Sequence, residues 1–521
     1  MEQQRVKYPI GQQSFEQLRA AGYLYVDKTR YVEKIVQQSQ YYFLGRPRRF
    51  GKSLFLTTLK AFFEGKRHLF KGLYIDSADW EWRPCPVMHL DLNLLRYDND
   101  ADLDNFLDEF LRNQEKLYGI MDPASTYSLR FAEVIRTAAQ LTGQSVVILV
   151  DEYDKPLINN IGNPKRYERM RSLLGALYSN FKSSADYIRL VFLTGVSRFG
   201  KLSVFSDLNN IRDLSLEDDF AGICGITDEE LCSDFHQGLA ELAAASGDTV
   251  DAERARLKSY YDGYHFSDNC LDIYNPFSLL NTFAKRKYRN YWIESGTPTL
   301  LLKVLQQTGI DLDYLVNAIC DSSDLSGLDI DNIRPIALFY QTGYLTIKEY
   351  NERRNIYRVG LPNKEVTEGF YSFILPYYAN LRQKTVSSVI NDFIDDLNHG
   401  ASESFMRRLQ SLFAGISYEM KMEEERNVQN AMLILFTLLG LDTDVEYRTS
   451  DGRIDILIRT ADFIYIMELK FDSSAESAIA QIKEKRYDLP WSTGRRGIIT
   501  IGINYSSAQR RIDSWVIDTA R

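Results

Sequence analysis

The stretch YYFLGRPRRFGKSLF, residues 41–55, decides the fold of the N-terminal part of this 521-residue chain. YYFLG is a short apolar run typical of a strand, and the residues from 53 to 65, SLFLTTLKAFFEG, have apolar side chains at helical spacing. A strand, a glycine-bearing loop and a helix form the context in which GKS binds phosphate, because backbone N–H groups at the helix N-terminus hold the anion. We therefore predict a nucleotide site in which Lys52 reaches the β- and γ-phosphates and Ser53 ligates Mg²⁺.

The loop departs from the usual pattern G-x-x-x-x-G-K-[ST]. Arg46 stands where the first glycine belongs, and Gly45 comes one residue too early. A chance GKS in a basic turn is the alternative reading. We expect Pro47 to stiffen the loop, and its arginines to bring charge near the phosphates or to contact another domain. The candidate phosphate-loop residues are Arg46, Pro47, Arg48, Arg49, Phe50, Gly51, Lys52 and Ser53.

A second motif, QSVVILVDEYDK at 144–155, strengthens the nucleotide reading. It is an apolar run of the buried-strand type that ends in Asp151 and Glu152. An aspartate at the end of such a strand can hold Mg²⁺, and a following carboxylate can activate a water molecule. Alone the segment could be an exposed acidic turn, but together with GKS it predicts binding of a nucleoside triphosphate.

Three further runs fit the same sheet: PVMHLDL (86–92), YIRLVFLTGVSRFG (187–200) and IRDLSL (211–216). Alternating strands and helices indicate an α/β fold with a parallel sheet covered on both faces. Thr194, at the end of the second run, could contact the γ-phosphate or the attacking water. Arg198 could stabilise transition-state charge, although a surface or interface arginine is an equally good reading.

Residues 221–400 show helical patterns and no catalytic constellation. A hairpin is expected between 338 and 362, and His265 is interpreted as a packed, hydrogen-bonded histidine rather than a catalytic one. The expected domains are an AAA-ATPase-like P-loop domain (1–220), a helical lid and connecting module (221–400) and a nuclease-like domain (401–521).

The last 120 residues carry a second constellation on two strand-like runs, GRIDILIR (452–459) and DFIYIMELK (462–470). Because side chains alternate along a strand, Glu468 and Lys470 share one face. Asp455 on the neighbouring strand could bind one or two Mg²⁺ ions together with Glu468, and Lys470 could orient or deprotonate a water that attacks a phosphodiester. The plainer alternative is a surface ion pair on an ordinary hairpin.

Helical segments flank these strands and add two auxiliary candidates. EEERNVQNAMLILFTLLG (423–440) offers Glu425 as a further metal ligand, although the two glutamates before it are equally placed. SAESAIAQIKEKRY (474–487) carries Gln481. Together the pattern predicts a nuclease-type α/β fold, which can also persist as a binding module without catalysis.

Over nearly its whole length the chain resembles a bacterial family that joins an AAA-ATPase-like domain to a C-terminal PD-(D/E)XK (restriction-endonuclease-like) domain. The resemblance rests on long motifs in the right order: YVDKT (25–29), RPRRFGKS (46–53), VILVDEYDKP (147–156), TGVSRFGKLSVFSDLNN (194–210), YDGYHF (261–266), YNPF (274–277), QTGYLTI (341–347), LPNKEV (361–366), GRIDILI (452–458), MELK (467–470) and QIKEKRY (481–487). It implies ATP binding at Gly51, Lys52, Ser53 and Asp151. It also implies a nuclease core at Asp455, Glu468 and Lys470, with Glu425 and Gln481 as auxiliaries.

Composition narrows the cellular context. Apolar runs are too short to cross a bilayer, the N-terminus lacks a secretory core, and the five cysteines form no C-x-x-C pair. We expect a cytoplasmic protein with no membrane partner. Homo-oligomers, including a ring, are suggested only by analogy with AAA proteins.

Two functional hypotheses follow. The first is an enzyme that uses ATP and Mg²⁺ and acts on nucleic acid, DNA rather than RNA. The second is a signalling NTPase switch whose C-terminal domain only binds a partner. The net charge of -9 and the lack of a dense basic run mildly favour the second. A purely structural P-loop protein without turnover is a third, weaker option.

Overall fold

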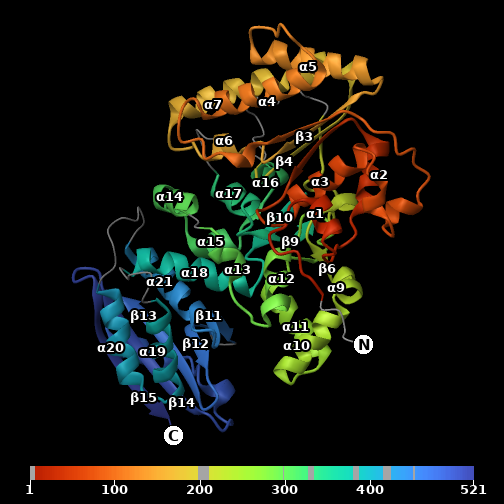
Figure 1. Cartoon of the computed structure of the whole chain (residues 1–521). Helices are drawn as coiled ribbons and strands as arrows, with labels where there is room; N and C mark the ends of the chain where they lie inside the picture. The colour runs from red at the N-terminus through yellow and green to blue at the C-terminus, as the bar shows by residue number, and fades with distance from the viewer. Residues whose placement is uncertain are drawn as a thin grey trace. The chain divides into compact units, whose positions relative to one another are not determined.

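The computed structural model describes residues 6–197, 211–296, 299–326, 334–379, 386–414, 424–449 and 452–520, without the side chains of some residues near the ends of helices and strands. The chain divides into two compact units, shown in Figure 1. The first comprises Met1–Ser295 and Asn317–Glu365, and the second comprises Gly296–Val316 and Val366–Arg521.

The first unit is built on a five-stranded parallel sheet in the order β2-β3-β4-β1-β5. Its strands are β1 (Tyr41–Gly45), β2 (Val87–Asp91), β3 (Val146–Asp151), β4 (Ile188–Gly195) and β5 (Arg212–Asp213). Parallel strands all end at the same edge, so the loop after β1 and the acidic end of β3 lie at one edge. Strand β4 lies between them and brings its own last residues to that edge.

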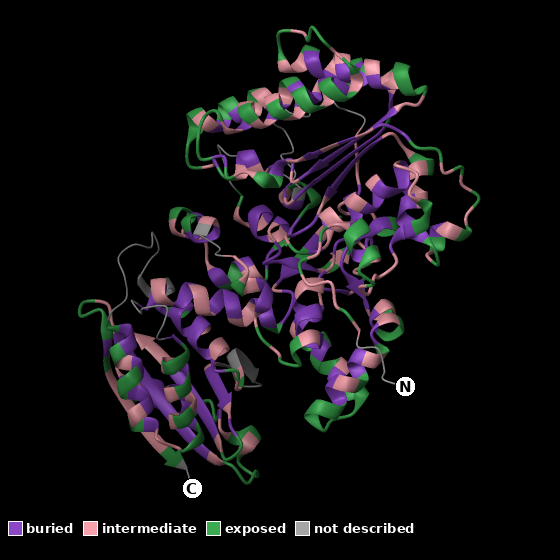
Figure 2. Ribbon diagram, in the orientation of Figure 1, coloured by how far each residue is buried: buried purple, intermediate pink, exposed green. Residues whose placement is uncertain are grey.

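Helices cover both faces of this sheet, as predicted (Figure 1). Helix α3 (Lys52–Phe63) packs on β2, β3 and β4, whereas α5 (Tyr127–Thr142) packs on β3 together with α4 (Asp102–Tyr118) and α7 (Pro164–Tyr178). Figure 2 shows the strands of the sheet buried between helices that each present one exposed face. Every residue of β3 is buried, which explains its continuous apolar run.

The rest of the first unit is mainly helical. It contains α9 (Asp228–Asp234), α10 (His236–Ser246), α11 (Val250–Tyr261), α12 (Pro276–Lys285) and α13 (Tyr291–Glu294). Helix α12 begins where its pattern requires, because the Asn275 side chain caps it and Pro276 occupies its first turn. Strands β9 (Thr346–Asn351) and β10 (Ile356–Gly360) form the expected hairpin.

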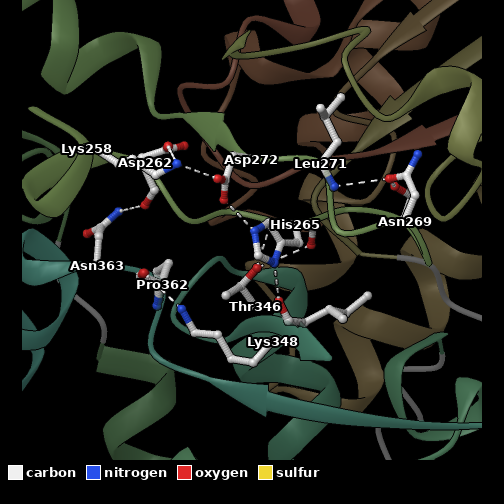
Figure 3. Close-up of polar contacts among 12 residues, drawn as sticks. Lys258, Asp262, His265, Asn269, Leu271, Asp272, Thr346, Lys348, Pro362 and Asn363 are labelled. Atoms are coloured by element: carbon white, nitrogen blue, oxygen red, sulfur yellow. Dashed lines mark hydrogen bonds and ion pairs between the residues drawn. The ribbon is translucent and has the colours of Figure 1, made fainter. Parts of the chain in front are cut away.

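His265 is held by hydrogen bonds on both ring nitrogens (Figure 3). Its Nδ1 lies 2.7 Å from the carbonyl oxygen of Ile347, and its Nε2 lies 2.7 Å from the Asp272 carboxylate. Lys258 donates to the same carboxylate at 2.8 Å. The histidine therefore ties the turn after α11 to strand β9, which confirms the interpretation as a packed residue.

The second unit has a five-stranded sheet in the order β11-β12-β13-β14-β15. The strands are β11 (Asp442–Thr449), β12 (Gly452–Arg459), β13 (Phe463–Phe471), β14 (Gly497–Ser506) and β15 (Arg511–Ala520). Only β13 and β14 pair in parallel, and the connection between them contains α22 (Ala475–Glu484), which packs on both. The second unit also contains α19 (Val386–Asn398), α20 (Ser402–Phe413) and α21 (Glu424–Leu438), together with α14 (Thr299–Thr308), α15 (Leu312–Val316) and most of α18 (Lys364–Tyr378). In the described parts of the chain, no helix has the length and apolarity needed to span a bilayer.

Candidate nucleotide and nuclease sites

The loop after β1 ends in a helix N-terminus that is open to an anion. Arg49 and Gly51 adopt left-handed backbone conformations, with φ of 69° and 100°, and α3 starts directly after them. No described side chain caps the first turn of α3. The N–H groups of that turn and the positive end of the helix dipole are thus available to phosphate.

Lys52 connects the two predicted nucleotide motifs. Its Nζ donates to the carbonyl oxygens of Arg46 (2.9 Å) and Pro47 (3.2 Å), and it lies 3.2 Å from a carboxylate oxygen of Glu152. The lysine side chain is only 3% exposed, so its charge is held in place by the loop and by the acidic end of β3. GKS and DE, which lie about 100 residues apart in the sequence, therefore form one site.

Thr194 joins the strand ends beside this site. Its hydroxyl donates to Asp151 at 2.5 Å and accepts from the backbone N–H of Glu152 at 3.3 Å. Thr194 is completely buried and Asp151 is 4% exposed, whereas the Glu152 side chain is 19% exposed. Glu152 also has φ of 52°, a conformation that turns the chain sharply after β3.

A hollow of about 340 Å³ lies over the loop. Its lining includes Arg48, Arg49, Gly51, Lys52, Ser53 and Glu152. Three cations, a helix N-terminus and one carboxylate suit a phosphate chain with a divalent cation. Asp151 is not among the lining residues, so the structure places Glu152, Ser53 and Lys52 at the surface of the hollow and Asp151 behind them.

An apolar cavity adjoins this hollow and shares Gly51, Leu54, Pro276 and Leu280 with it. Further along, its walls are mainly aromatic and aliphatic, with Tyr25, Val26, Phe50, Ile223 and Ile226 among them. Lys28 is the only Lys or Arg among the residues that line it, and its Nζ is held by Glu230 and by the carbonyl oxygen of Gly222 at 2.8 Å.

Arg46 lies outside the hollow, which corrects the expectation that it brings charge to the phosphates. It is 1% exposed, and its guanidinium donates to the carbonyl oxygens of Gly45 (2.9 Å), Ser215 (2.8 Å) and Phe220 (3.1 Å). The guanidinium carbon lies 4.4 Å from the centre of the Phe266 ring. A glycine at this position could make none of these contacts. Arg46 is therefore a packing residue that binds carbonyl groups beneath the loop.

The other loop residues contact aromatic side chains from later in the first unit. Trp292 donates from its indole to the Arg48 carbonyl at 3.0 Å, and the Arg48 guanidinium lies 5.1 Å from the same ring. Arg49 lies over Phe277 at 4.9 Å. Phe50 packs edge-on against Tyr264 at 4.8 Å. The sequence suggested contact with another domain, and the structure shows contacts with the 264–292 segment of the same unit.

Asp154 lies beside the nucleotide site and was not predicted from the sequence. Its buried Oδ2 accepts hydrogen bonds from the Val196 N–H (2.9 Å), the Ser197 N–H (2.6 Å) and the Ser197 hydroxyl (2.8 Å). Burial, with the nearby Glu152 charge, raises the pKa of Asp154 to about 7. The second aspartate of D-E-Y-D was the available signal. Arg198, the next predicted residue, lies outside the described residues.

In the second unit, the three predicted carboxylate and lysine residues converge at the ends of β12 and β13. Lys470 Nζ lies 3.2 Å from Glu468 Oε1 and donates to Gln481 Oε1 at 2.5 Å. The Gln481 amide donates back to the same oxygen of Glu468. Asp455 accepts a hydrogen bond from the Leu469 N–H at 2.9 Å. Asp455, Glu468, Lys470 and Gln481 therefore form one cluster.

Glu468 has the properties expected of a metal ligand. It is 2% exposed, and its Oε2 has no hydrogen-bond partner among the described residues. Burial and the neighbouring Asp455 carboxylate raise its pKa to about 7, while Lys470 opposes the shift. An unpartnered, buried carboxylate oxygen beside a second carboxylate fits a divalent cation.

The side chains that the structure describes do not provide a complete set of metal ligands in the second unit. Glu425 lies in α21, but its side chain is outside the described residues. Among the side chains that the structure describes, no group of three or more His, Cys, Asp and Glu residues could hold a metal ion. Two carboxylates would leave the remaining positions to water and substrate, which suits Mg²⁺.

Comparisons with known proteins agree with both predicted domain types. A family model described as a predicted AAA-ATPase matches residues 9–205, and one described as the PD-(D/E)XK nuclease superfamily matches residues 423–515. The chain is also 33% identical, over 99% of both sequences, to an "Uncharacterized protein in vnfD 5'region" of Azotobacter chroococcum mcd 1.

The fold and sites thus define a protein with an AAA-ATPase-like domain, a helical middle region and a nuclease-superfamily domain. The chain belongs to the family that joins an AAA-ATPase-like domain to a C-terminal PD-(D/E)XK domain, and the Azotobacter protein is one of its relatives.

Proposed function

We propose that the protein binds and hydrolyses ATP, and that this activity controls a Mg²⁺-dependent phosphodiesterase site acting on nucleic acid. The observation that carries the proposal is the cluster of Glu468, Lys470, Gln481 and Asp455 in a chain whose Lys52 and Glu152 form a separate phosphate site.

In the first unit, the N–H groups at the start of α3 and Lys52 bind the phosphates, and Arg48 and Arg49 add positive charge at the rim of the hollow. Ser53 is the hydroxyl available to Mg²⁺. Glu152, which Lys52 holds at 3.2 Å, is placed to accept a proton from the attacking water. The apolar cavity beside Gly51 accommodates the base, because its walls offer aromatic and aliphatic surface.

In the second unit, Asp455 and Glu468 would hold Mg²⁺, which when bound supplies charge for the developing phosphorane and lowers the pKa of water. Glu468 must lose its proton to act as a ligand, so its raised pKa links metal binding to pH near 7. Gln481 fixes the Lys470 ammonium at 2.5 Å and thereby orients it toward the water that attacks the phosphodiester.

The test measures cleavage of single-stranded and duplex DNA and of RNA with Mg²⁺, with and without ATP. Wild type is compared with Lys52→Ala, Glu152→Gln and Asp455→Ala, and with Glu476→Gln as an exposed control in α22. We expect Asp455→Ala to abolish cleavage, Lys52→Ala to abolish ATP binding, and Glu152→Gln to abolish hydrolysis but not binding. Unchanged cleavage by Asp455→Ala would remove the assigned nuclease site.

A second candidate function is an NTPase switch whose C-terminal domain binds a partner without catalysis. It is favoured by the hydrogen bonds in which Lys470 and Gln481 both contact one oxygen of Glu468. ATP-dependent binding that needs no divalent cation in the second unit, with no cleavage under any condition above, would support it.

A further inference from the structure

A hollow of about 370 Å³ opens on the first unit between α10, α11 and the segment that follows α12. These helices lie together in Figure 1. The volume is within the range of ligand pockets, about 300–1,000 Å³. Its charged and aromatic lining is Glu253, Arg256, Arg286, Lys287, Arg289, Tyr260 and Tyr288.

The hollow is strongly basic in a chain whose net charge is -9. Four cationic side chains line it against one carboxylate, that of Glu253. Three of the four come from the run KRKYR at 285–289. This run corrects the expectation that the sequence lacks a dense basic segment. Positive charge gathered around a concave surface concentrates anions there.

Stabilisation of the C-terminal end of α12 explains only some of the basic residues in this run. Lys285 is the last residue of α12, where a cation stabilises the helix dipole, and Arg286 pairs with Glu241 at 2.8 Å. Lys287 and Arg289 lie beyond the helix and are exposed. Within the described parts of the chain, no hydrogen bond or ion pair involves either of their side chains. Their charges are free to meet a ligand.

The floor of the hollow is preorganised. Glu253 is 1% exposed and accepts a hydrogen bond from the Tyr288 hydroxyl. The Arg256 guanidinium lies 4.4 Å from the centre of the Tyr288 ring and 3.7 Å from Glu253. Tyr288 also stacks on Tyr261, with centroids 6.0 Å apart and planes at 3°. These two contacts orient the arginine before any ligand arrives, which lowers the entropy cost of binding.

We propose that this hollow binds the phosphate backbone of a single nucleic-acid strand. Arg256, Lys287 and Arg289 contact phosphates. The Tyr260 ring lies 5.0 Å from that of Tyr288, and the Lys364 ammonium lies over it at 4.7 Å, so a base would contact the part of the ring that Lys364 leaves uncovered. Concavity selects the single strand, because a duplex is too wide to enter a pocket of this volume. An acidic peptide could pair with the cationic side chains but has no base to stack on the tyrosine rings.

The inference extends the proposed function by placing a substrate contact on the ATPase-like unit, and its test does not depend on cleavage. Binding of a fluorescein-labelled 20-nucleotide DNA strand is followed by anisotropy, in EDTA and without ATP, over a range of salt. Wild type is compared with the double variant K287Q/R289Q. The control K116Q/R136Q removes the same charge from two exposed positions on α4 and α5.

Each phosphate contact on a single strand contributes about 0.7 to the slope of log K against log salt. Losing two contacts lowers the slope by about 1.4, and extrapolation from 1 M to 0.1 M salt then gives about 25-fold weaker binding at 0.1 M. We expect this result for K287Q/R289Q, with unchanged melting temperature, and wild-type binding for K116Q/R136Q.

Three outcomes would overturn the inference: equal binding by the two double variants, equal binding of the matching duplex, or displacement of the strand by polyglutamate as effectively as by unlabelled strand. Failure of the nuclease proposal is seen separately, as absence of cleavage by wild type. Binding that depends on Lys287 and Arg289 without any cleavage would support this site and the non-catalytic alternative together.

Discussion

Arg46→Ala tests the assignment of this arginine as a packing residue. The change removes three hydrogen bonds from a charged donor to the carbonyl oxygens of Gly45, Ser215 and Phe220, at 2.8–3.1 Å, and the contact with Phe266. A buried carbonyl left without its donor costs about 1–3 kcal/mol. Because the arginine is 1% exposed, its burial already carries a desolvation cost, which also lowers the pKa of its guanidinium. Water that enters the vacated space recovers part of the loss.

The expected net destabilisation is about 3–5 kcal/mol, in the range found when one partner of a buried charged network is removed. At about 2–3 °C per kcal/mol for a unit of this size, the first unfolding transition should fall by about 6–15 °C. The measurement is thermal unfolding followed by fluorescence, with ATP affinity determined separately at 15 °C, where the variant remains folded.

Arg49→Ala is the matched control from the same loop. Arg49 is exposed and lines the hollow over α3, so its loss should leave the melting temperature within about 2 °C and weaken ATP binding. The reasoning would be refuted if Arg46→Ala kept the wild-type melting temperature and lost ATP binding more than ten-fold, because Arg46 would then be a phosphate ligand.

Three further predictions concern single side chains. Burial raises the pKa of Glu468 from 4.5 to about 7, so ionisation of this carboxyl group lowers the stability of the fold as pH rises through that window. At pH 8 in EDTA, Glu468→Gln should therefore be about 2–3 kcal/mol more stable than wild type. Denaturant unfolding measures the difference, and equal stability would refute the pKa shift. Glu365 is fully buried and accepts hydrogen bonds from the Ser278 hydroxyl and the Trp292 N–H through one oxygen, and burial raises its pKa to about 8. Ionisation of this group should lower stability as pH rises from 5 to 8, so Glu365→Gln should reduce the loss of stability measured over that window, and an unchanged loss would refute the shift. Gly343→Ala would place a methyl group 2.7 Å from Pro47, at a residue whose φ is 87°. The variant should lose about 2–4 kcal/mol of folding stability and bind ATP more weakly. Gly247→Ala is the control: with φ of 77° and open space around it, it should lose only the backbone strain of about 1 kcal/mol.

Local patterns allowed the strands and helices around each site to be predicted. The apolar run before GKS, the run before Asp151 and the alternating β13 strand all form the expected elements, because burial on both faces or one face leaves a direct mark on the sequence. Glu468 and Lys470 also share one face as strand alternation indicated, whereas Gln481, an auxiliary implied by the family resemblance, reaches them from α22.

Contacts between distant segments could not be predicted in the same way. The position of Arg46 depends on the backbone carbonyl groups of Ser215 and Phe220, about 170 residues away. The side chains of these two residues give no sign that their carbonyl groups accept hydrogen bonds from an arginine. The order β2-β3-β4-β1-β5 likewise comes from packing, and it is this order that places Thr194 next to Asp151. The basic hollow was not predicted, although the run KRKYR at 285–289 was a signal for it; its other lining residues come from α10 and α11.

The aromatic contacts of the phosphate loop limit how the chain can be divided. Pro47, Arg48 and Phe50 rest on residues between Tyr264 and Gly343, beyond residue 205 where the match to the ATPase family model ends. A fragment cut at that boundary would retain every nucleotide motif and lose the surface that shapes the loop. Recombination that joined the ATPase-like segment alone to another protein would therefore not transfer a functional unit. The segment and the helical region that follows it must be inherited together.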